Sequence, residues 1–273
     1  VPLPPIPFQE KIESLIKEVH KKRDKANKKY EETERVLNKT LGIENLKLRR
    51  NKIFETRFSE VGIENRFDAE YYEPRFTEIS KILKTSRYDC KRLRDLGRLV
   101  NLRVNPSERP PNKFTYVEIG DVNISTGEIE IKTVLGYKAP PNARKLLKKG
   151  DLIISMVRPT RGAITIIPEE LDNSVGSTAF YVLRAESPLK ESLFVYLRSF
   201  LGLSQLGRAV VGAMYPTLKE NYIDNILVPI IPEERQKRIF SLVIEFFNLR
   251  KDAKELLDKA RREVEGFIEN KNL

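Results

Sequence analysis

The sequence contains very few of the residues that build disulfides or transition-metal sites. It has one cysteine, Cys90, and one histidine, His20. A single cysteine excludes an intramolecular disulfide and fits a reducing compartment. One histidine and one cysteine also leave no ligand set for a zinc or iron cluster. We therefore expect no metal site.

Long apolar runs and nucleotide-binding motifs are lacking as well. No stretch is long enough to span a bilayer, and the sequence shows no secretory signal pattern, so we expect a cytoplasmic protein. The Gly207–Gly212 segment lacks the lysine of a phosphate-binding loop. The "NPSERPP" run, Asn105–Pro111, departs from the Asn-Pro-Pro-aromatic signature of amino-methyltransferases, because Ser107 stands at its third position and no aromatic residue follows. The sequence predicts no cofactor.

Positive charge, in contrast, is abundant and unevenly distributed. The formal net charge is +11, and residues 87–162 hold 16 basic and 8 acidic side chains. Positive charge clustered in a folded segment points to a polyanion partner, most often nucleic acid. We therefore expect double-stranded DNA as a partner. A general excess of lysine in the proteome is the alternative explanation.

The chain repeats one phrase at a distance of 227 residues. Its opening, "VPLPPIPFQEKIESLI", aligns without a gap on "VPIIPEERQKRIFSLV", which begins at Val228. Self-similarity of this kind predicts two equivalent structural units. In both copies the apolar residues alternate at steps of four and three, and prolines stand just before the expected helix start. We predict two long helices of roughly 40 Å each.

These helices are expected to form an antiparallel coiled coil, because a chain that leaves one helix and builds a domain returns most simply in that direction. Two separate surface helices on a globular core are the alternative. Antiparallel packing places Ile16 nearer Val264 than Val243. It also brings Arg23 and Arg250 near the middle of the seam. The residues expected to pair the helices are Ile12, Ile16, Val19, Ala26, Tyr30, Ile239, Val243, Phe246, Ala253, Leu257 and Val264.

The residues between the helices have the pattern of a mixed α/β domain, so the predicted fold class is α+β. The predicted division is 1–45 for the first helix, 46–227 for the domain and 228–273 for the second helix. A helix-rich connector over 44–86 precedes short segments that have strand periodicity and are bounded by glycine or proline. The expected strands are 114–119, 128–135, 150–157, 162–167 and 179–185, with a hairpin turn at 125–127 and a helix over 190–201.

The loops of this domain carry the candidate DNA contacts. Arg158 and Arg161 lie in one loop, where their guanidinium groups could reach a guanine edge or phosphates. Other loops gather lysines, arginines and hydroxyl side chains of the kind that hold phosphates. The candidate DNA-binding residues are Arg103, Arg109, Lys113, Lys138, Arg144, Lys145, Arg158, Thr160, Arg161, Ser177, Thr178, Tyr215 and Lys219, with Lys148 and Lys149 beside them.

A catalytic alternative rests on three residues. Asp121, Glu130 and Lys132 have the spacing of a magnesium-dependent nuclease, in which two carboxylates hold the metal and the lysine polarises the attacking water. Acidic residues near a hairpin are common, so the pattern has little specificity. His20 has Phe247 as its counterpart in the repeat, which favours a place beside the helix seam over a role as general base.

Five phrases, in this order along the chain, resemble the specificity subunits of type I restriction–modification systems. The phrases are "RFDAEYYEPRFTEI" (66–79), "YVEIGDVNISTGEI" (116–129), "LKKGDLIISMVRPTRGAI" (147–164), "GSTAFYVLRA" (176–185) and "YPTLKENYIDNILVPIIPEERQKRI" (215–239), the last echoed at 1–12. The resemblance covers nearly the whole chain and implies a subunit without catalytic residues of its own.

The resemblance also implies how such a chain works. A full subunit of this family has two target-recognition domains, each reading half of a split DNA site, and two repeated helices that pack antiparallel. The helices set the spacing and dock modification subunits, and through them restriction subunits. This chain has one such domain and resembles the C-terminal half of a full subunit, so a homodimer is a further expectation. A protein-binding coiled-coil scaffold is the third alternative.

Overall fold

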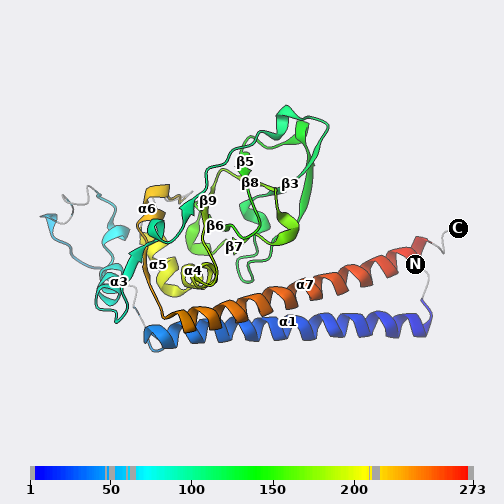
Figure 1. The fold of residues 1–273 in the computed structure, drawn as a ribbon, viewed down its shortest axis with the longest axis horizontal. Helices are drawn as coiled ribbons and strands as arrows, with labels where there is room; N and C mark the ends of the chain where they lie inside the picture. Colours follow the sequence, from blue (N-terminus) through cyan, green and yellow to red (C-terminus); the bar gives the residue numbers. More distant parts are fainter. Residues whose placement is uncertain are drawn as a thin grey trace.

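The fold is described from a computed structural model of the chain (Figure 1). The described residues are 4–46, 48, 53–59, 61, 66–208, 210 and 216–269. A mixed domain of short strands and helices sits on one end of a pair of long helices. No helix in these ranges is long and apolar enough to cross a membrane.

The two long helices are the repeated segments. α1 spans Ile6–Leu41 and α7 spans Glu233–Glu269, 36 and 37 residues respectively. At ~1.5 Å per residue each is about 54 Å long, which exceeds the predicted length. α1 extends as far as Gly42, whose φ of 70° ends the helix while the Ile43 N–H bonds the Asn38 carbonyl at 3.0 Å. A glycine in this left-handed conformation is a common helix terminator.

The two helices run antiparallel, as predicted. At the end remote from the domain, Phe8 stacks on Phe267 with ring centroids 4.8 Å apart. Further along, the Lys22 ammonium pairs with Asp252 at 2.7 Å. Other cross-helix ion pairs join Lys11 to Glu263, Lys29 to Glu245 and Glu32 to Arg238. As the residue number rises along α1, the number of its partner on α7 falls, so the two helices are antiparallel. The contacts are spread along the length of the pair.

Burial along the seam is uneven. Leu257 is 36% exposed, although the heptad pattern placed it in the seam. Its counterpart in the repeat, Tyr30, is covered by Phe194 of the domain at a ring distance of 6.2 Å, and Leu257 has no such cover in the described part of the chain. Among the predicted pairing residues, Val19, Ala26, Ile239, Val243, Phe246 and Ala253 are buried, and Ile12, Ile16, Tyr30 and Val264 are half-buried.

Arg250 lies in the seam and is only 9% exposed. Its guanidinium donates to Asn27 Oδ1 at 2.5 Å and pairs with Glu128 of the domain at 3.4 Å. Burial lowers the pKa of Arg250, the Glu128 carboxylate opposes that shift, and the nearby Arg23 adds to it. The domain therefore supplies the acidic neighbour that offsets two like charges in the seam.

The domain contains two four-stranded sheets and one two-stranded ribbon. The first sheet has the order β2-β9-β6-β7, the second β4-β3-β8-β5, and the ribbon joins β1 to β10. Pairing is antiparallel except between β3 and β8. The strands are β1 (Cys90–Arg92), β2 (Arg98–Leu99), β3 (Lys113–Val117), β4 (Lys132–Leu135), β5 (Ala143–Leu146), β6 (Leu152–Ser155), β7 (Ile164–Ile166), β8 (Val175–Ser177), β9 (Phe180–Arg184) and β10 (Leu227–Pro229).

Short helices connect the sheets to the long helix pair. They are α3 (Pro74–Lys84), α4 (Leu189–Arg198), α5 (Phe200–Arg208) and α6 (Glu220–Asp224). The helix predicted over 190–201 breaks at Ser199, whose hydroxyl donates to the Tyr196 carbonyl at 2.6 Å. The strand predicted over 128–135 begins only at Lys132, because the preceding residues form a turn in which Ile129 makes a single bridge to Val122.

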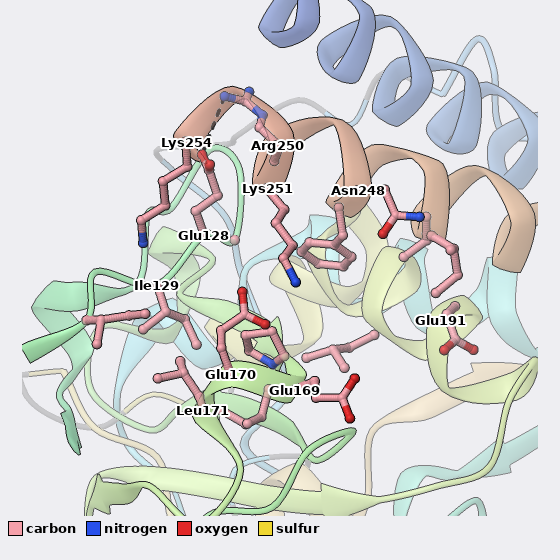
Figure 2. Close-up of a pocket in the computed structure, with 18 of the residues that line it drawn as sticks. Glu128, Ile129, Glu169, Glu170, Leu171, Glu191, Asn248, Arg250, Lys251 and Lys254 are labelled. Carbon is pink, nitrogen blue, oxygen red and sulfur yellow. Dashed lines mark ion pairs between the residues drawn. The ribbon is translucent and has the colours of Figure 1, made fainter. Parts of the chain in front are cut away.

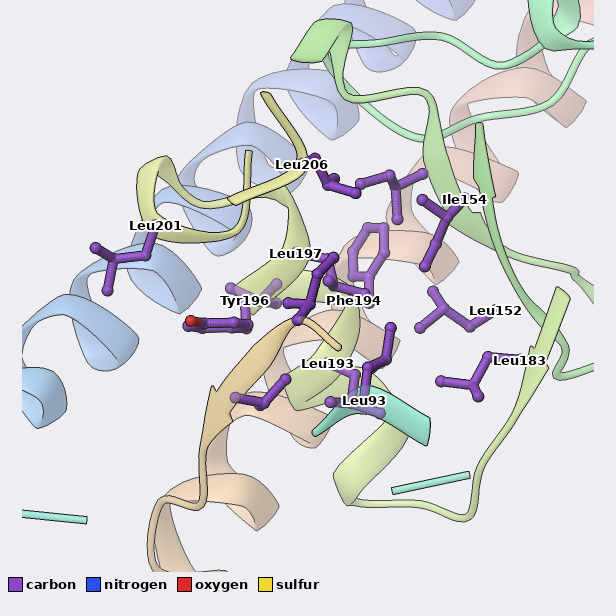
Figure 3. Packing of buried hydrophobic residues seen from close by; sticks show 14 of the residues in the cluster. Leu93, Leu152, Ile154, Leu183, Leu193, Phe194, Tyr196, Leu197, Leu201 and Leu206 are labelled. Atoms are coloured by element: carbon purple, nitrogen blue, oxygen red, sulfur yellow. The ribbon is translucent and has the colours of Figure 1, made fainter. Parts of the chain in front are cut away.

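The main core lies between the first sheet and α4 (Figure 3). Leu152, Ile154 and Leu183 of the sheet face Leu193, Phe194 and Leu197 of the helix, and all six are fully buried. Burying a side chain of this size contributes about 1.5–3 kcal/mol. The same cluster includes Ile239 and Val243 of α7. The domain and the helix pair therefore share one core, which fixes the first sheet and α4 on the helices.

Candidate nucleic-acid interface

Four of the predicted DNA-binding residues line one groove on the second sheet. The groove has a volume of about 690 Å³ and is bounded by the 3₁₀ turn η3 (Pro106–Glu108), the start of β3, β5, and the segment before β8. The four cations are Arg103, Arg109, Lys113 and Arg144. The other lining residues are Val104, Asn105, Pro106, Glu108, Asn112, Phe114, Leu146, Asn173 and Val175.

The positive charges of the groove are not neutralised internally. Within the described ranges, no acidic oxygen lies within 4.0 Å of a charged nitrogen of these four side chains. Three of them are exposed, and the half-buried Arg144 donates Nη1 only to the adjacent Ala143 carbonyl at 2.9 Å. Uncompensated positive charge along a concave surface raises the local concentration of a polyanion.

The backbone that presents these cations is held by strand pairing. The Val104 N–H bonds the Arg144 carbonyl at 2.9 Å, and Leu146 N–H bonds the Leu102 carbonyl at the same distance. Along β5, Ala143 and Lys145 are buried while Arg144 and Leu146 line the groove. This is the two-residue alternation of a β-strand, and it places one cation of β5 in the groove and the other in the interior.

The η3 turn is fixed by the neighbouring turn η5 (Gly136–Lys138). The Gly136 N–H bonds the Asn112 carbonyl at 2.9 Å, and a Cβ at position 136 would lie 2.5 Å from the Pro106 carbonyl oxygen and closer still to that of Arg109. Only glycine allows the two backbones to approach this closely. Lys138 of η5 is exposed beside the groove, with its ammonium 5.6 Å from the exposed Tyr137 ring.

Two of the predicted DNA contacts, Lys145 and Ser177, have side chains that face the interior. Lys145 is 4% exposed; its ammonium donates to the Phe180 carbonyl at 2.6 Å and pairs with Glu220 at 3.3 Å. Ser177 is 1% exposed, and its hydroxyl accepts hydrogen bonds from the Asn142 amide and the Ala179 N–H, both at 3.2 Å. Both side chains bond neighbouring parts of the domain and are buried from solvent.

Three further candidates lie at the sheet but outside the groove lining. Thr178 is half-buried, and its N–H bonds the Asn142 carbonyl at 2.8 Å. Lys148 bonds the Asn173 side chain, and Lys149 pairs with Glu169 at 2.8 Å. Glu169 partly neutralises Lys149, so this lysine contributes less to the field of the groove than the four cations without acidic partners. Lys148 is bonded to a neutral amide and keeps its charge.

The remaining candidates form a second basic group away from the groove. Arg158 has a φ of 48°, and its N–H bonds the Pro216 carbonyl at 2.8 Å. The turn η6 (Pro159–Arg161) follows it and carries the exposed Thr160 and Arg161. Lys219 is exposed just before α6, and Tyr215 lies outside the described residues. The exposed basic candidates therefore divide into a group that lines the groove and a second group around η6 and the start of α6.

The residues of the nuclease alternative have structural partners. Asp121 is 3% exposed, and its carboxylate accepts the Glu118 N–H at 2.9 Å and pairs with the Lys132 ammonium. These contacts close the 3₁₀ turn Ile119–Asp121 and raise the pKa of Lys132 through its hydrogen bond to Asp121. Glu130 is exposed and precedes the strand that carries Lys132. In the described part of the chain, no three His, Cys, Asp or Glu side chains are placed to hold a metal ion.

A second cavity, of about 380 Å³, lies between the domain and α7 (Figure 2). Its wall includes apolar residues such as Ile129, and its charged residues have both signs. Lys251 of α7 and Glu170 of the domain enter it from opposite walls, and Glu128 pairs with Arg250 at its edge. Mixed charge of this kind does not attract a polyanion, so we place the candidate interface at the groove.

Sequence reasoning missed the uncharged and acidic residues of the groove. Asn105, Glu108, Asn112 and Asn173 line it beside the cations. These side chains carry no positive charge, so the distribution of basic residues does not reveal them. The signal that could have found the first two is the "NPSERPP" run, which was tested only as a methyltransferase signature.

Comparison with known proteins finds similar sequences and structures. No family model matches the chain. Over 159 residues it is 28% identical to the type I restriction enzyme HindI specificity subunit of Haemophilus influenzae, a match that covers 55% of this chain and 33% of that protein. A solved structure of a type I R-M system superimposes with a TM-score of 0.51 and 30% identity, covering 65% of this chain and 46% of the other.

The chain is similar to type I restriction–modification specificity subunits. The HsdS subunit of Thermoanaerobacter tengcongensis is also similar, with a TM-score of 0.49, 29% identity, and coverage of 67% of this chain and 48% of that one. The chain spans half or less of the length of each of these proteins. Its described residues form one mixed domain and two long helices that pack together.

Proposed function

We propose that the chain recognises double-stranded DNA in a sequence-specific way and catalyses no reaction itself. The observation that carries this proposal is the groove in which Arg103, Arg109, Lys113 and Arg144 stand without acidic partners. Phosphate oxygens of a duplex would supply the missing counter-charges. The relationship to specificity subunits supports the same function. Such a protein would act in the cytoplasm, as one component of a restriction–modification complex.

The helix pair would serve as spacer and as docking surface for modification subunits, which would in turn bring restriction subunits. Two features support this role: the pair is about 54 Å long, and it shares a core with the recognition domain. A rigid connection of this kind transmits the position of the domain along the helices. The chain would then read one half of a split site.

The repeat supports a place for a second recognition unit. Phe194 of the domain contacts Tyr30 of α1 and Phe247 of α7, the latter at 5.5 Å. The counterparts of these two residues are Leu257 and His20, and both are exposed. A two-fold arrangement would place another domain on this open pair of positions. We propose that a second copy of the recognition domain, in the same polypeptide or in a homodimer, occupies it.

A mobility-shift titration of the full chain against random-sequence duplexes tests the proposed function. Affinity should fall as salt rises, with a logarithmic slope of about −3 to −4 if four phosphates are neutralised. Replacing Arg103 and Arg144 by alanine should weaken binding to every duplex and reduce the slope by about 2. Replacing Lys81 and Lys84, two exposed lysines on α3, removes the same charge outside the groove and should change the slope less.

The same titration separates the alternatives. A chain that recognises DNA should bind with or without magnesium and leave the duplex intact. Cleavage that requires magnesium and disappears in Lys132→Ala would revive the nuclease. Absence of DNA binding at every salt concentration would leave a protein-binding scaffold as the function.

A further inference from the structure

One carboxylate stands among the cations of the groove and pairs with none of them. Glu108 is exposed at the rim, in the η3 turn. Its Oε1 accepts a hydrogen bond from the Asn105 side-chain amide at 2.9 Å. In the described ranges, no lysine or arginine nitrogen lies within 4.0 Å of it. A carboxylate in this position repels phosphate, so it does not serve the electrostatic attraction that the four cations provide.

A carboxylate and an amide do what arginine and lysine cannot do, because they accept hydrogen bonds. In the major groove, cytosine presents an amino donor at N4 and adenine presents one at N6 beside the N7 acceptor. Glutamate can accept from the cytosine amino group, and asparagine can bond both adenine positions. Guanine and thymine present acceptors at the corresponding sites, which a carboxylate disfavours. Asn105 and Glu108 therefore have the chemistry to distinguish bases.

The turn that carries these two side chains is rigid. The Glu108 N–H bonds the Asn105 carbonyl, and the Arg109 N–H bonds the Pro106 carbonyl, both at 3.1 Å. Gly136 packs against the same turn so closely that no other residue fits without displacing it. A side chain presented by a fixed backbone loses less entropy on binding and discriminates between ligands more sharply.

We propose that Asn105 and Glu108 are specificity-determining residues, which read the exocyclic amino group of a cytosine or adenine while the four cations of the groove hold phosphates. This inference rests on the proposed function and adds to it a division of labour within the groove. It assigns base recognition to residues that carry no positive charge.

Selection from a randomised duplex library, followed by sequencing, tests this division. The wild-type chain should prefer an amino base at one position of the selected site. Glu108→Ala should reduce that preference by about 5- to 150-fold, the range that corresponds to one good base contact. The preferences at other positions should stay the same. Glu186→Ala removes an exposed carboxylate outside the groove and is the matched control.

Gly136→Ala provides a second variant, because it displaces the η3 turn without removing any side chain from the groove. The same preference should weaken in this variant. Glu108 is exposed, so its replacement leaves the fold intact even if Gly136→Ala proves unstable. Circular dichroism on each variant checks this point.

The outcomes distinguish the inference from the function on which it rests. A uniform gain in affinity for all sequences in Glu108→Ala, with unchanged base preference, would mean that the carboxylate only repels phosphate, and it would overturn the inference alone. Unchanged affinity and preference would overturn it equally. Failure of the wild-type chain to bind any duplex would overturn the proposed function together with the inference.

Discussion

At the scale of single residues, one fully buried carboxylate of the domain is held by a partly exposed arginine. Asp151 is fully buried, and its two carboxylate oxygens accept hydrogen bonds from Arg184 Nε at 2.7 Å and Nη2 at 2.9 Å. The Lys148 N–H adds a third at 2.9 Å. These contacts join β9 to the turn before β6. The pKa of Arg184 is raised by its hydrogen bonds to Asp151.

Arg184→Met should destabilise the protein by about 3 kcal/mol, because it leaves the Asp151 carboxylate buried without its counter-ion. Urea unfolding followed by circular dichroism measures this loss; the chain has no tryptophan to report it by fluorescence. Lys237→Ala, which removes an exposed partner of Glu233 on α7, is the control and should cost about 0.5 kcal/mol or less. Equal losses in the two variants would show that Arg184 and Asp151 contribute no more than a surface pair.

The second basic group has a separate prediction. Replacing Arg158 and Arg161 together by alanine should weaken specific DNA binding, since an arginine–guanine contact is typically worth ~1–3 kcal/mol. Competition between specific and random duplexes at fixed salt measures this effect. Unchanged affinity and sequence preference would remove the η6 loop from the interface and leave the groove as the sole contact.

At the scale of elements, the helix pair is closely packed where small residues meet. Ala26 is fully buried, and Ala253 and Ala260 of α7 are 1% and 3% exposed. The repeat and the heptad steps predicted this pair and most of its covered positions, because seam periodicity is a local property of the sequence, whereas the exposure of Leu257 depends on the domain. The direction of the pair was predicted from the way the chain must return after building the domain. The end of α1 was harder to predict from the sequence, because polar residues without a clear heptad pattern continue the helix to Leu41, just before Gly42.

Ala26→Leu should destabilise the protein by about 1–3 kcal/mol, because the larger side chain does not fit between the helices. Thermal and urea unfolding measure the loss. Lys28→Leu, on the exposed side of the same helix, makes a similar change in helix propensity and should have little effect. If both variants were equally stable, the helices would be looser at this level than the burial of Ala26 indicates.

The short strands of the domain were harder to predict, for physical reasons. β5 lies in a segment so rich in lysine, arginine and proline that it has the composition of a loop, and its inward-facing Lys145 is stabilised only by distant partners, Phe180 and Glu220. β8 has three residues and contains Gly176. The groove itself could not be predicted, since it depends on Arg103 meeting β5 across 42 residues of sequence. The positive charge of the groove could be predicted, because the excess of basic residues is visible in the composition of residues 87–162.

At the scale of the whole molecule, the antiparallel pair gives a ranking of distances within one chain. The cross-helix ion pairs place Lys17 level with residue 257 of α7. Measured along the helix axis, Lys259 is about 3 Å from that level and Ser241 is about 24 Å from it. All three positions are exposed, so labels there spare the seam.

Spin labels at positions 17 and 259, in a Cys90→Ser background, should therefore show a much shorter distance than labels at 17 and 241. Dilution with unlabelled chain distinguishes pairs within a chain from pairs between chains. The reverse ranking within one chain would contradict the antiparallel arrangement. A short distance that disappears on dilution would mean that the helices exchange between two copies.

Because the domain and the helix pair share a core at one end of the helices, a small rotation there produces a large displacement at the other end. An arm of about 54 Å that pivots by 5° moves its far end by about 5 Å, and one base pair rises 3.4 Å. Small rotations at the anchor therefore amount to more than one step along a duplex. Two contacts hold the domain to the helices at that point: Arg250 pairs with Glu128, and Arg198 donates to Tyr30. Under the proposed function, the stiffness of these contacts would set how much variation in the spacing of a split site the protein tolerates.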